Sequence, residues 1–172
     1  DLAVILRFCN RSEELVYMRK EVEVLKRYME IQRIRLADSF TFSVEVPAEL
    51  EDCLVPKMML QPLAENAVLH GLSGVDGGRL EVTVSAADGV LHICVADNGA
   101  GLPQELLGKY RPHAAGEGHL GLFNVDTILQ KHYGAEFGLF LANRAEGAGA
   151  VITATLPVTR REASDHAEGT GR

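Results

Sequence analysis

Three short polar motifs hold the residues of this sequence that could do chemistry. The first, LQPLAENAVLHG at residues 60–71, places Glu65 and Asn66 together on a helical stretch, with His70 one turn further on. An amide oxygen is a hard, neutral ligand suited to Mg²⁺, and an adjacent carboxylate can orient or deprotonate a metal-bound or attacking group. Taken alone, however, the motif is more typical of a polar helix face.

The second motif, VADNGAGLP at residues 95–103, follows an apolar, strand-like segment. A buried carboxylate at Asp97 can accept a hydrogen bond from the exocyclic amine of adenine, whereas guanine presents a carbonyl there and would be repelled. Gly99 and Gly101 would let the backbone approach the ring closely. Such a bond contributes roughly 1.5 to 3 kcal/mol. On its own, DNG is more often an ordinary turn.

The third motif, GHLGLFNV at residues 118–125, places Gly118 and Gly121 before a helix. Unpaired amides at a helix N-terminus bind phosphate, helped by the helix dipole. GxxGL by itself is common in packed turns. All three motifs in this order favour a nucleotide-binding site over three unrelated structural features.

A long amphipathic helix is predicted over residues 14–36. Its apolar residues, spaced alternately by three and four, are Leu15, Met18, Val22, Leu25 and Met29. The strict seam is close to the coiled-coil period. Two interpretations stay open with equal weight: a partner helix from a second chain, or packing on the chain's own domain.

The remaining patterns predict a sheet covered by helices. Alternating segments typical of strands occupy residues 40–46, 79–86, 90–97, 137–143 and 150–157. Helical patterns occupy residues 56–71, with a kink at Pro62, and residues 120–132. We expect a hairpin turn at residues 87–89, a flexible Gly-rich loop at 98–118 with a short helix after Pro103, and a frayed polar end from Arg160. Hairpins with helices on one side indicate an α+β fold, a two-layer sandwich with a mixed, mostly antiparallel sheet.

Composition excludes several classes of protein. Among 172 residues, 17 Lys and Arg stand against 24 Asp and Glu, a net charge of −7, which argues against nucleic-acid binding. The uncharged stretch at 147–159 is too short to span a bilayer, and no signal peptide is evident at the start. Cys9, Cys53 and Cys94 form no CxxC pair, so we expect a reducing compartment with neither a disulfide framework nor a zinc site.

The three motifs resemble the N, G1 and G2 boxes of the GHKL (Bergerat) ATP-binding fold, shared by gyrase B, histidine kinases and MutL. Within that superfamily the sequence is most similar to the LytS/YesM type of sensor histidine kinase. The similarity covers YMEIQRIRL at residues 28–36, LQPLAENAVLHG, GHLGLFNVDTIL at 118–129 and the pair Tyr133-Gly134. It therefore extends over nearly the whole chain.

The resemblance implies a catalytic domain that binds Mg-ATP and transfers the γ-phosphoryl group to a histidine, for relay to a response regulator. Asn66 would hold Mg²⁺, Glu65 would act as a base, and Asp97 would bind adenine. The remaining nucleotide-binding residues would be His70, Gly99, Gly101, Gly118, Leu120, Gly121 and Leu122. Residues 102–117 would form an ATP lid whose ordering gates the transfer.

Two positions depart from the family pattern. Leu69 replaces a lysine of the N box, and Ile128 replaces an arginine of the G2 helix. Each change removes a cation from the expected phosphate end, which predicts weaker affinity for the triphosphate. Cationic residues of the lid region could compensate, namely Lys109, Arg111, His113 and His119.

The family's phosphoacceptor segment, an HFLFN-like sequence, does not occur here. No credible acceptor is found among the six histidines, His70, His92, His113, His119, His132 and His166. The resemblance therefore implies a dimerisation region with its connecting helix at residues 1–37, a catalytic domain at 38–159 and a tail at 160–172, with the acceptor upstream. The expected whole protein is a bacterial membrane-anchored homodimer whose cytoplasmic portion is this domain.

Other functions remain open. A degenerate nucleotide-binding module could act through protein contacts, and an anti-sigma-type serine-protein kinase shares the same pocket. An ATP-dependent machine such as gyrase would need a transducer domain, and too little sequence follows Leu156 to form one.

Overall fold

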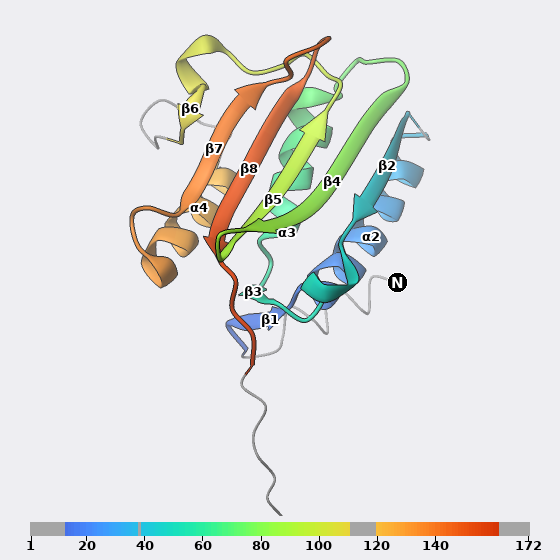
Figure 1. Cartoon of the computed structure of the whole chain (residues 1–172). Coiled ribbons are helices and arrows are strands. Elements are labelled where there is room, and N and C mark those ends of the chain that lie inside the picture. The colour runs from blue at the N-terminus through green and yellow to red at the C-terminus, as the bar shows by residue number, and fades with distance from the viewer. Residues whose placement is uncertain (1–12, 38, 111–119, 162–172) are drawn as a thin grey trace, which may run out of the picture.

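The computed structural model describes residues 13–37, 39–110 and 120–161 (Figure 1). Its centre is a six-stranded sheet, and the strands in spatial order are β2 (Phe40–Glu45), β4 (Gly78–Ala87), β5 (Val90–Asp97), β8 (Ala150–Pro157), β7 (Gly138–Asn143) and β6 (Gly108–Lys109). β2 and β4 pair in parallel, and every other neighbouring pair is antiparallel. The predicted mixed, mostly antiparallel sheet is confirmed.

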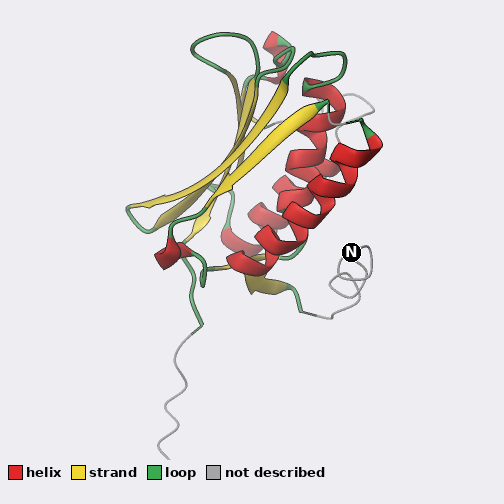
Figure 2. Cartoon of the chain, turned by 90° about the vertical axis from the view of Figure 1, so that its right-hand side faces the viewer, coloured by secondary structure: helices red, strands yellow, loops and turns green. Residues whose placement is uncertain are grey.

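All the long helices lie on one face of this sheet (Figure 2). They are α2 (Met18–Arg35), α3 (Leu60–Asn66), which continues as the π-helical segment η2 (Ala67–Gly71), and α4 (Leu120–Tyr133). Along β5, Leu91 and Ile93 are fully buried beneath the helices, whereas His92 between them is half-buried on the open face. The expected two-layer sandwich is confirmed.

The hairpin between β4 and β5 turns at Asp88 and Gly89, as predicted. Both residues have positive φ, 52° and 77°, the backbone that a two-residue turn needs to match the twist of its strands. The described part of the chain also contains two short 3₁₀ helices, η1 (Ala48–Leu50) and η3 (Gln104–Leu106), and η3 is the predicted helix after Pro103. Strand β6 inside the Gly-rich loop was not predicted.

The predicted first helix begins later than expected. Residues Leu15–Tyr17 form strand β1, which pairs with β3 (Leu54–Pro56) in a separate antiparallel ribbon. The amide of Met18 then donates to the Cys53 carbonyl oxygen at 2.8 Å. The helical prediction for residues 14–17 is therefore wrong, because backbone pairing with β3 prevails over the side-chain periodicity.

The second predicted helix also differs from expectation. It begins at Leu60 and not at Pro56, since Pro56 ends β3 and Met58 adopts a positive φ of 63°. The predicted kink at Pro62 is wrong: Pro62 lies in the first turn of α3, where its missing N–H would have had no helical partner. The irregularity falls instead in η2, where the amide of Leu72 donates to the carbonyl oxygen of Ala67.

The seam of α2 packs on the chain's own core. Met18, Leu25 and Met29 are each 0 to 1% exposed, and Val22 packs against the same cluster. Of the two interpretations left open for these residues, packing on their own domain therefore holds. Within the described ranges, no helix combines the length and the apolar character needed to cross a membrane.

A buried carboxylate joins α2 to the start of α3. Glu21 is 3% exposed, and its carboxylate accepts hydrogen bonds from the amides of Met58 at 2.6 Å and Leu60 at 3.2 Å. These amides precede or open α3, so Glu21 caps that helix from another element. Burial raises the pKa of Glu21 to about 7, against the lowering effect of the hydrogen bonds.

Glu21 should make stability depend on pH. Because its pKa is higher in the folded chain than the ordinary 4.5, folding takes up a proton, and its contribution to the free energy of unfolding falls as pH rises from about 4.5 to 7. We expect Glu21→Gln to remove this dependence. The difference in the free energy of unfolding between variant and parent should therefore change by on the order of 2 kcal/mol between pH 4.5 and pH 7. Urea unfolding at pH 5 and pH 7.5 measures it.

Glu30→Gln provides the control, since Glu30 is an exposed glutamate of the same helix. This variant should shift stability equally at the two pH values. A pH-independent difference between Glu21→Gln and the parent would contradict the prediction.

Candidate functional site

Asp97 is a buried carboxylate at the end of β5. It is 3% exposed, and its Oδ1 accepts hydrogen bonds from the amides of Gly99 at 2.8 Å and Ala150 at 3.2 Å. The first bond closes the turn that follows β5, and the second ties it to the beginning of β8. The carboxylate is thereby fixed by backbone groups on two segments.

Asp97 lies directly against the end of the first motif. A Cβ atom added to Gly71 would lie 2.8 Å from Oδ2 of Asp97, and a Cβ added to Gly99 would overlap the carbonyl oxygen of Gly71. That oxygen also accepts the amide of Ala100 at 3.1 Å. The first and second motifs therefore meet backbone to backbone, and only glycine fits at Gly71 and Gly99. The sequence pattern indicated Gly71 only as the end of a helix.

Two asparagines hold the loop around the second motif. Oδ1 of Asn98 accepts the amide of Arg79 at 2.6 Å. Asn143, at the end of β7, accepts the amide of Leu102 at 2.6 Å and donates to its carbonyl oxygen at 3.0 Å. Between them, Gly101 has a positive φ of 79°. The role of Asn143 was missed, because it carries no signal beyond the end of a strand.

A cavity of about 110 Å³ joins the first motif to the third. Its lining consists of Pro62, Glu65, Asn66, Leu69, His70, Gly121 and Leu122. α3 and α4 come close beside it, since a Cβ on Gly121 would lie 3.1 Å from the Cβ of Pro62. Asp97 does not line this cavity. It lies beside Gly71, at the other end of η2 from Asn66.

Glu65 is held by a residue outside the three motifs. The hydroxyl of Tyr28, on α2, donates to Oε1 of Glu65 at 2.8 Å. Burial, followed by the hydrogen bond to Glu65, raises the pKa of Tyr28 to about 12, so the hydroxyl remains protonated in any ordinary buffer. No motif-based argument indicated this contact, because 37 residues separate the two side chains.

The other predicted site residues differ in their exposure to solvent, and some lie outside the described residues. Leu122 is 1% exposed and belongs to the core, whereas Leu120 is 70% exposed. Gly118 lies outside the described residues, as do three of the cations suggested to compensate, Arg111, His113 and His119.

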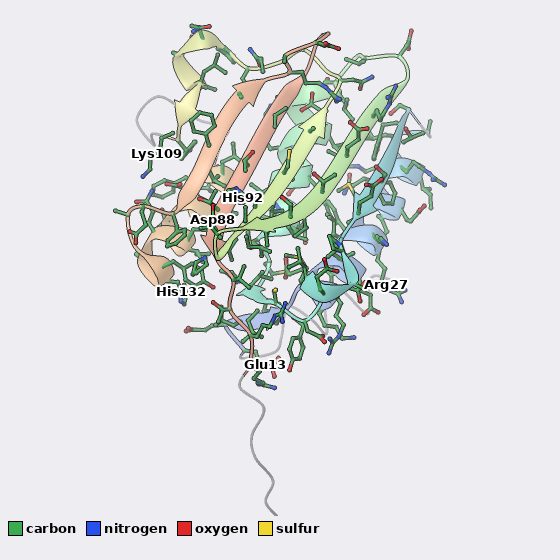
Figure 3. All side chains as sticks on the ribbon, viewed as in Figure 1. Glu13, Arg27, Asp88, His92, Lys109 and His132 are labelled. Carbon is green, nitrogen blue, oxygen red and sulfur yellow. The ribbon has the colours of Figure 1, made fainter. Side chains whose placement is uncertain are left out.

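The aliphatic replacements are both on the surface: Leu69 is 46% exposed and Ile128 is 36% exposed. The suggested cation Lys109 is on edge strand β6. Figure 3 shows its side chain on the opposite side of the molecule from Arg27, a residue of α2. Its ammonium group donates to the carbonyl oxygen of Ala135. In this arrangement Lys109 contacts the segment after α4, and not the cavity.

Residues 52–160 match the sequence family described as histidine kinase-, DNA gyrase B- and HSP90-like ATPase. The chain is 30% identical over 147 residues to the sensor histidine kinase YesM of Bacillus subtilis, which covers 85% of this chain and 24% of that protein. It is 35% identical over 144 residues to the sensor protein LytS of Oceanobacillus iheyensis, covering 80% of this chain and 24% of that protein. The chain thus spans about a quarter of the length of these relatives.

Solved structures share the fold. The catalytic domain of histidine kinase ThkA superposes with a TM-score of 0.66 and 21% identity, over 86% of this chain and 97% of that one. ThkA in complex with the response regulator protein TrrA gives a TM-score of 0.63 and 19% identity, over 92% of this chain and 47% of that one.

Proposed function

Since the chain belongs to the family of histidine kinase-, DNA gyrase B- and HSP90-like ATPases and is homologous to the catalytic domains of LytS/YesM-type sensor histidine kinases, we propose that it transfers the γ-phosphoryl group of Mg-ATP to a protein histidine. The observation that carries this proposal is the contact among Gly71, Asp97 and Gly99, which joins two motifs around one buried carboxylate.

Asp97 is proposed to recognise adenine. Its Oδ1 is engaged by two backbone amides, and its carboxylate packs against Gly71, where an added Cβ would lie 2.8 Å from Oδ2. A carboxylate is an acceptor only, so it suits the amine of adenine and repels the carbonyl of guanine. Burial strengthens this preference because water cannot compete for the oxygen.

Asn66 and Glu65 are proposed to act at the phosphate end. Both line the 110 Å³ cavity, where Asn66 supplies a neutral oxygen of the hard kind that Mg²⁺ prefers and Glu65 supplies a carboxylate that can accept a proton. Bound Mg²⁺ would neutralise charge on the phosphates. Glu65 is proposed to take the proton from the attacking group or from a metal-bound water, and Asn66 to ligate the cation. His70, Gly101, Gly118, Leu120, Gly121 and Leu122 complete the proposed nucleotide site.

The proposed partners are two protein domains other than this catalytic domain. We infer a dimerisation domain that carries the phosphoacceptor histidine, and a response regulator that receives the phosphoryl group, as the complex of ThkA with TrrA supports for that kinase. The whole protein is proposed to be a membrane-anchored bacterial homodimer, with this domain in its cytoplasmic portion. Its proposed division is residues 1–37, 38–159 and 160–172.

A second candidate function is a nucleotide-binding module that regulates by protein contact. It is favoured by Leu69 and Ile128, two exposed aliphatic side chains at positions where the family resemblance implies cations. Such a module would bind ATP weakly and transfer nothing.

Transfer in trans distinguishes the two candidates. The 172-residue chain, mixed with Mg-ATP and a separately supplied dimerisation domain of a LytS-type kinase, should phosphorylate the acceptor histidine. Asn66→Ala should lower the rate about tenfold, because one ligand of the cation is lost. The same reaction in EDTA provides the control, and it should abolish the difference between parent and variant. Nucleotide binding without any transfer would favour the regulatory module.

A further inference from the structure

The contact between Tyr28 and Glu65 crosses from α2 to α3 at the edge of the cavity. The phenol is half-buried, and its hydroxyl is 2.8 Å from Oε1 of Glu65. Glu65 also lines the cavity together with Asn66. The carboxylate that faces the proposed phosphate end is therefore tied to a helix that carries none of the three motifs.

α2 is itself fixed along α3, so the tyrosine hydroxyl has a defined position. Glu21 accepts hydrogen bonds from the amides of Met58 and Leu60 at the start of α3. Tyr28 follows Glu21 by two helical turns, about 10 Å along the axis. Between them Leu25 is 1% exposed and packs in the core. The contact of Glu21 therefore fixes α2 relative to α3 near the start of α3, and the contact of Tyr28 does so near its end.

We propose that Tyr28 is a positioning residue that holds the carboxylate of Glu65 in the orientation needed to accept a proton. The inference rests on the proposed role of Glu65 as a base. A glutamate side chain has three rotatable torsions, and a bond to Oε1 removes most of that freedom. The other oxygen, Oε2, is then the acceptor for the reacting proton. A base displaced by a fraction of an ångström loses much of its rate advantage.

The Tyr28 hydroxyl is the donor in this contact, and Oε1 of Glu65 is the acceptor. The ring also packs against the core, so a purely structural role for Tyr28 has to be separated from a positioning role.

Tyr28→Phe in the 172-residue chain removes the hydroxyl and keeps the ring. We expect kcat for transfer to the supplied dimerisation domain to fall about tenfold, with KM for Mg-ATP changed less than about twofold, because nucleotide contacts are retained. Tyr133→Phe is the matched control: this hydroxyl is buried and has no hydrogen-bond partner among the described residues. Both constants should stay unchanged in the control.

A double-mutant cycle separates positioning from structure. In a Glu65→Gln background, Tyr28→Phe should reduce kcat by less than about twofold further, since the group it positions is gone. If Tyr28→Phe lowers kcat by the same factor in both backgrounds, or leaves it at the parent value, the inference is overturned.

A ligand-free measurement tests the contact without relying on activity. The ¹³C carboxyl resonance of Glu65, assigned by its loss in Glu65→Gln, should shift in Tyr28→Phe and stay in place in Tyr133→Phe. An unshifted resonance in Tyr28→Phe would overturn the inference. Absence of transfer by the parent chain, with the resonance shifting as expected, would instead overturn the proposed function and leave the contact standing.

Discussion

Replacing Asp97 by asparagine should lower the affinity for Mg-ATP by about tenfold to a hundredfold and abolish the preference over Mg-GTP. Asparagine matches aspartate in shape, and its amide oxygen can still accept the amides of Gly99 and Ala150. The fold is therefore retained. The group above Gly71 becomes an NH₂ donor, however, which repels the amine of adenine and suits the carbonyl of guanine. Calorimetry with both nucleotides measures the change.

Asp126→Asn is the matched control for this substitution. Asp126 is equally buried, at 3% exposed, but it accepts the amide of Leu139 and the side chain of Gln130 on the far part of α4. We expect a loss of stability of about 1 kcal/mol and an unchanged ratio of ATP to GTP affinity. Identical heats for parent and Asp97→Asn with both nucleotides would refute the adenine assignment.

Gly99→Ala should destabilise the chain by about 3 kcal/mol or more and eliminate nucleotide binding. The added methyl group would overlap the carbonyl oxygen of Gly71, a backbone atom that cannot rotate away. Relief requires separation of the β5 turn from η2, which breaks the hydrogen bond from Ala100 to Gly71. Thermal or urea unfolding measures the loss of stability.

Gly74→Ala separates steric overlap from backbone strain. Gly74 has a positive φ of 73°, but no atom lies within 4 Å of the position that an added methyl group would take. The expected cost is therefore about 1 kcal/mol, from backbone strain alone. If Gly99→Ala were no more destabilising than Gly74→Ala, the close contact between the two motifs would be wrong.

The sheet and most of the helices could be predicted because periodicity and turn chemistry act locally. Asp88-Gly89 indicates its hairpin, and alternation along β5, β7 and β8 separates the buried face from the open one. Residues 14–17 and 56–59 were assigned wrongly because their conformation depends on pairing between β1 and β3, which lie far apart in the sequence. Local patterns carry no information on that pairing.

The candidate site was predictable where a residue's chemistry is fixed by its own motif. Asp97, Asn66 and Glu65 were identified in this way, and their roles stay predictions. Tyr28, Glu21 and Asn143 were not identified, since each acts on a segment that the fold alone brings near. A tyrosine or glutamate on an amphipathic helix gives no sign of which carboxylate or amide it will meet.

The parallel pairing of β2 with β4 determines where the first motif can exist. Two parallel neighbouring strands cannot be joined by a tight turn, so a crossover connection must run back along the sheet before β4 begins. α3 and η2 form this connection. The length of the return path is therefore dictated by the sheet. A residue inserted in α3 or η2 would move Gly71 out of its contact with Asp97. A residue inserted among the mostly exposed residues 73–77 would enlarge only a surface turn.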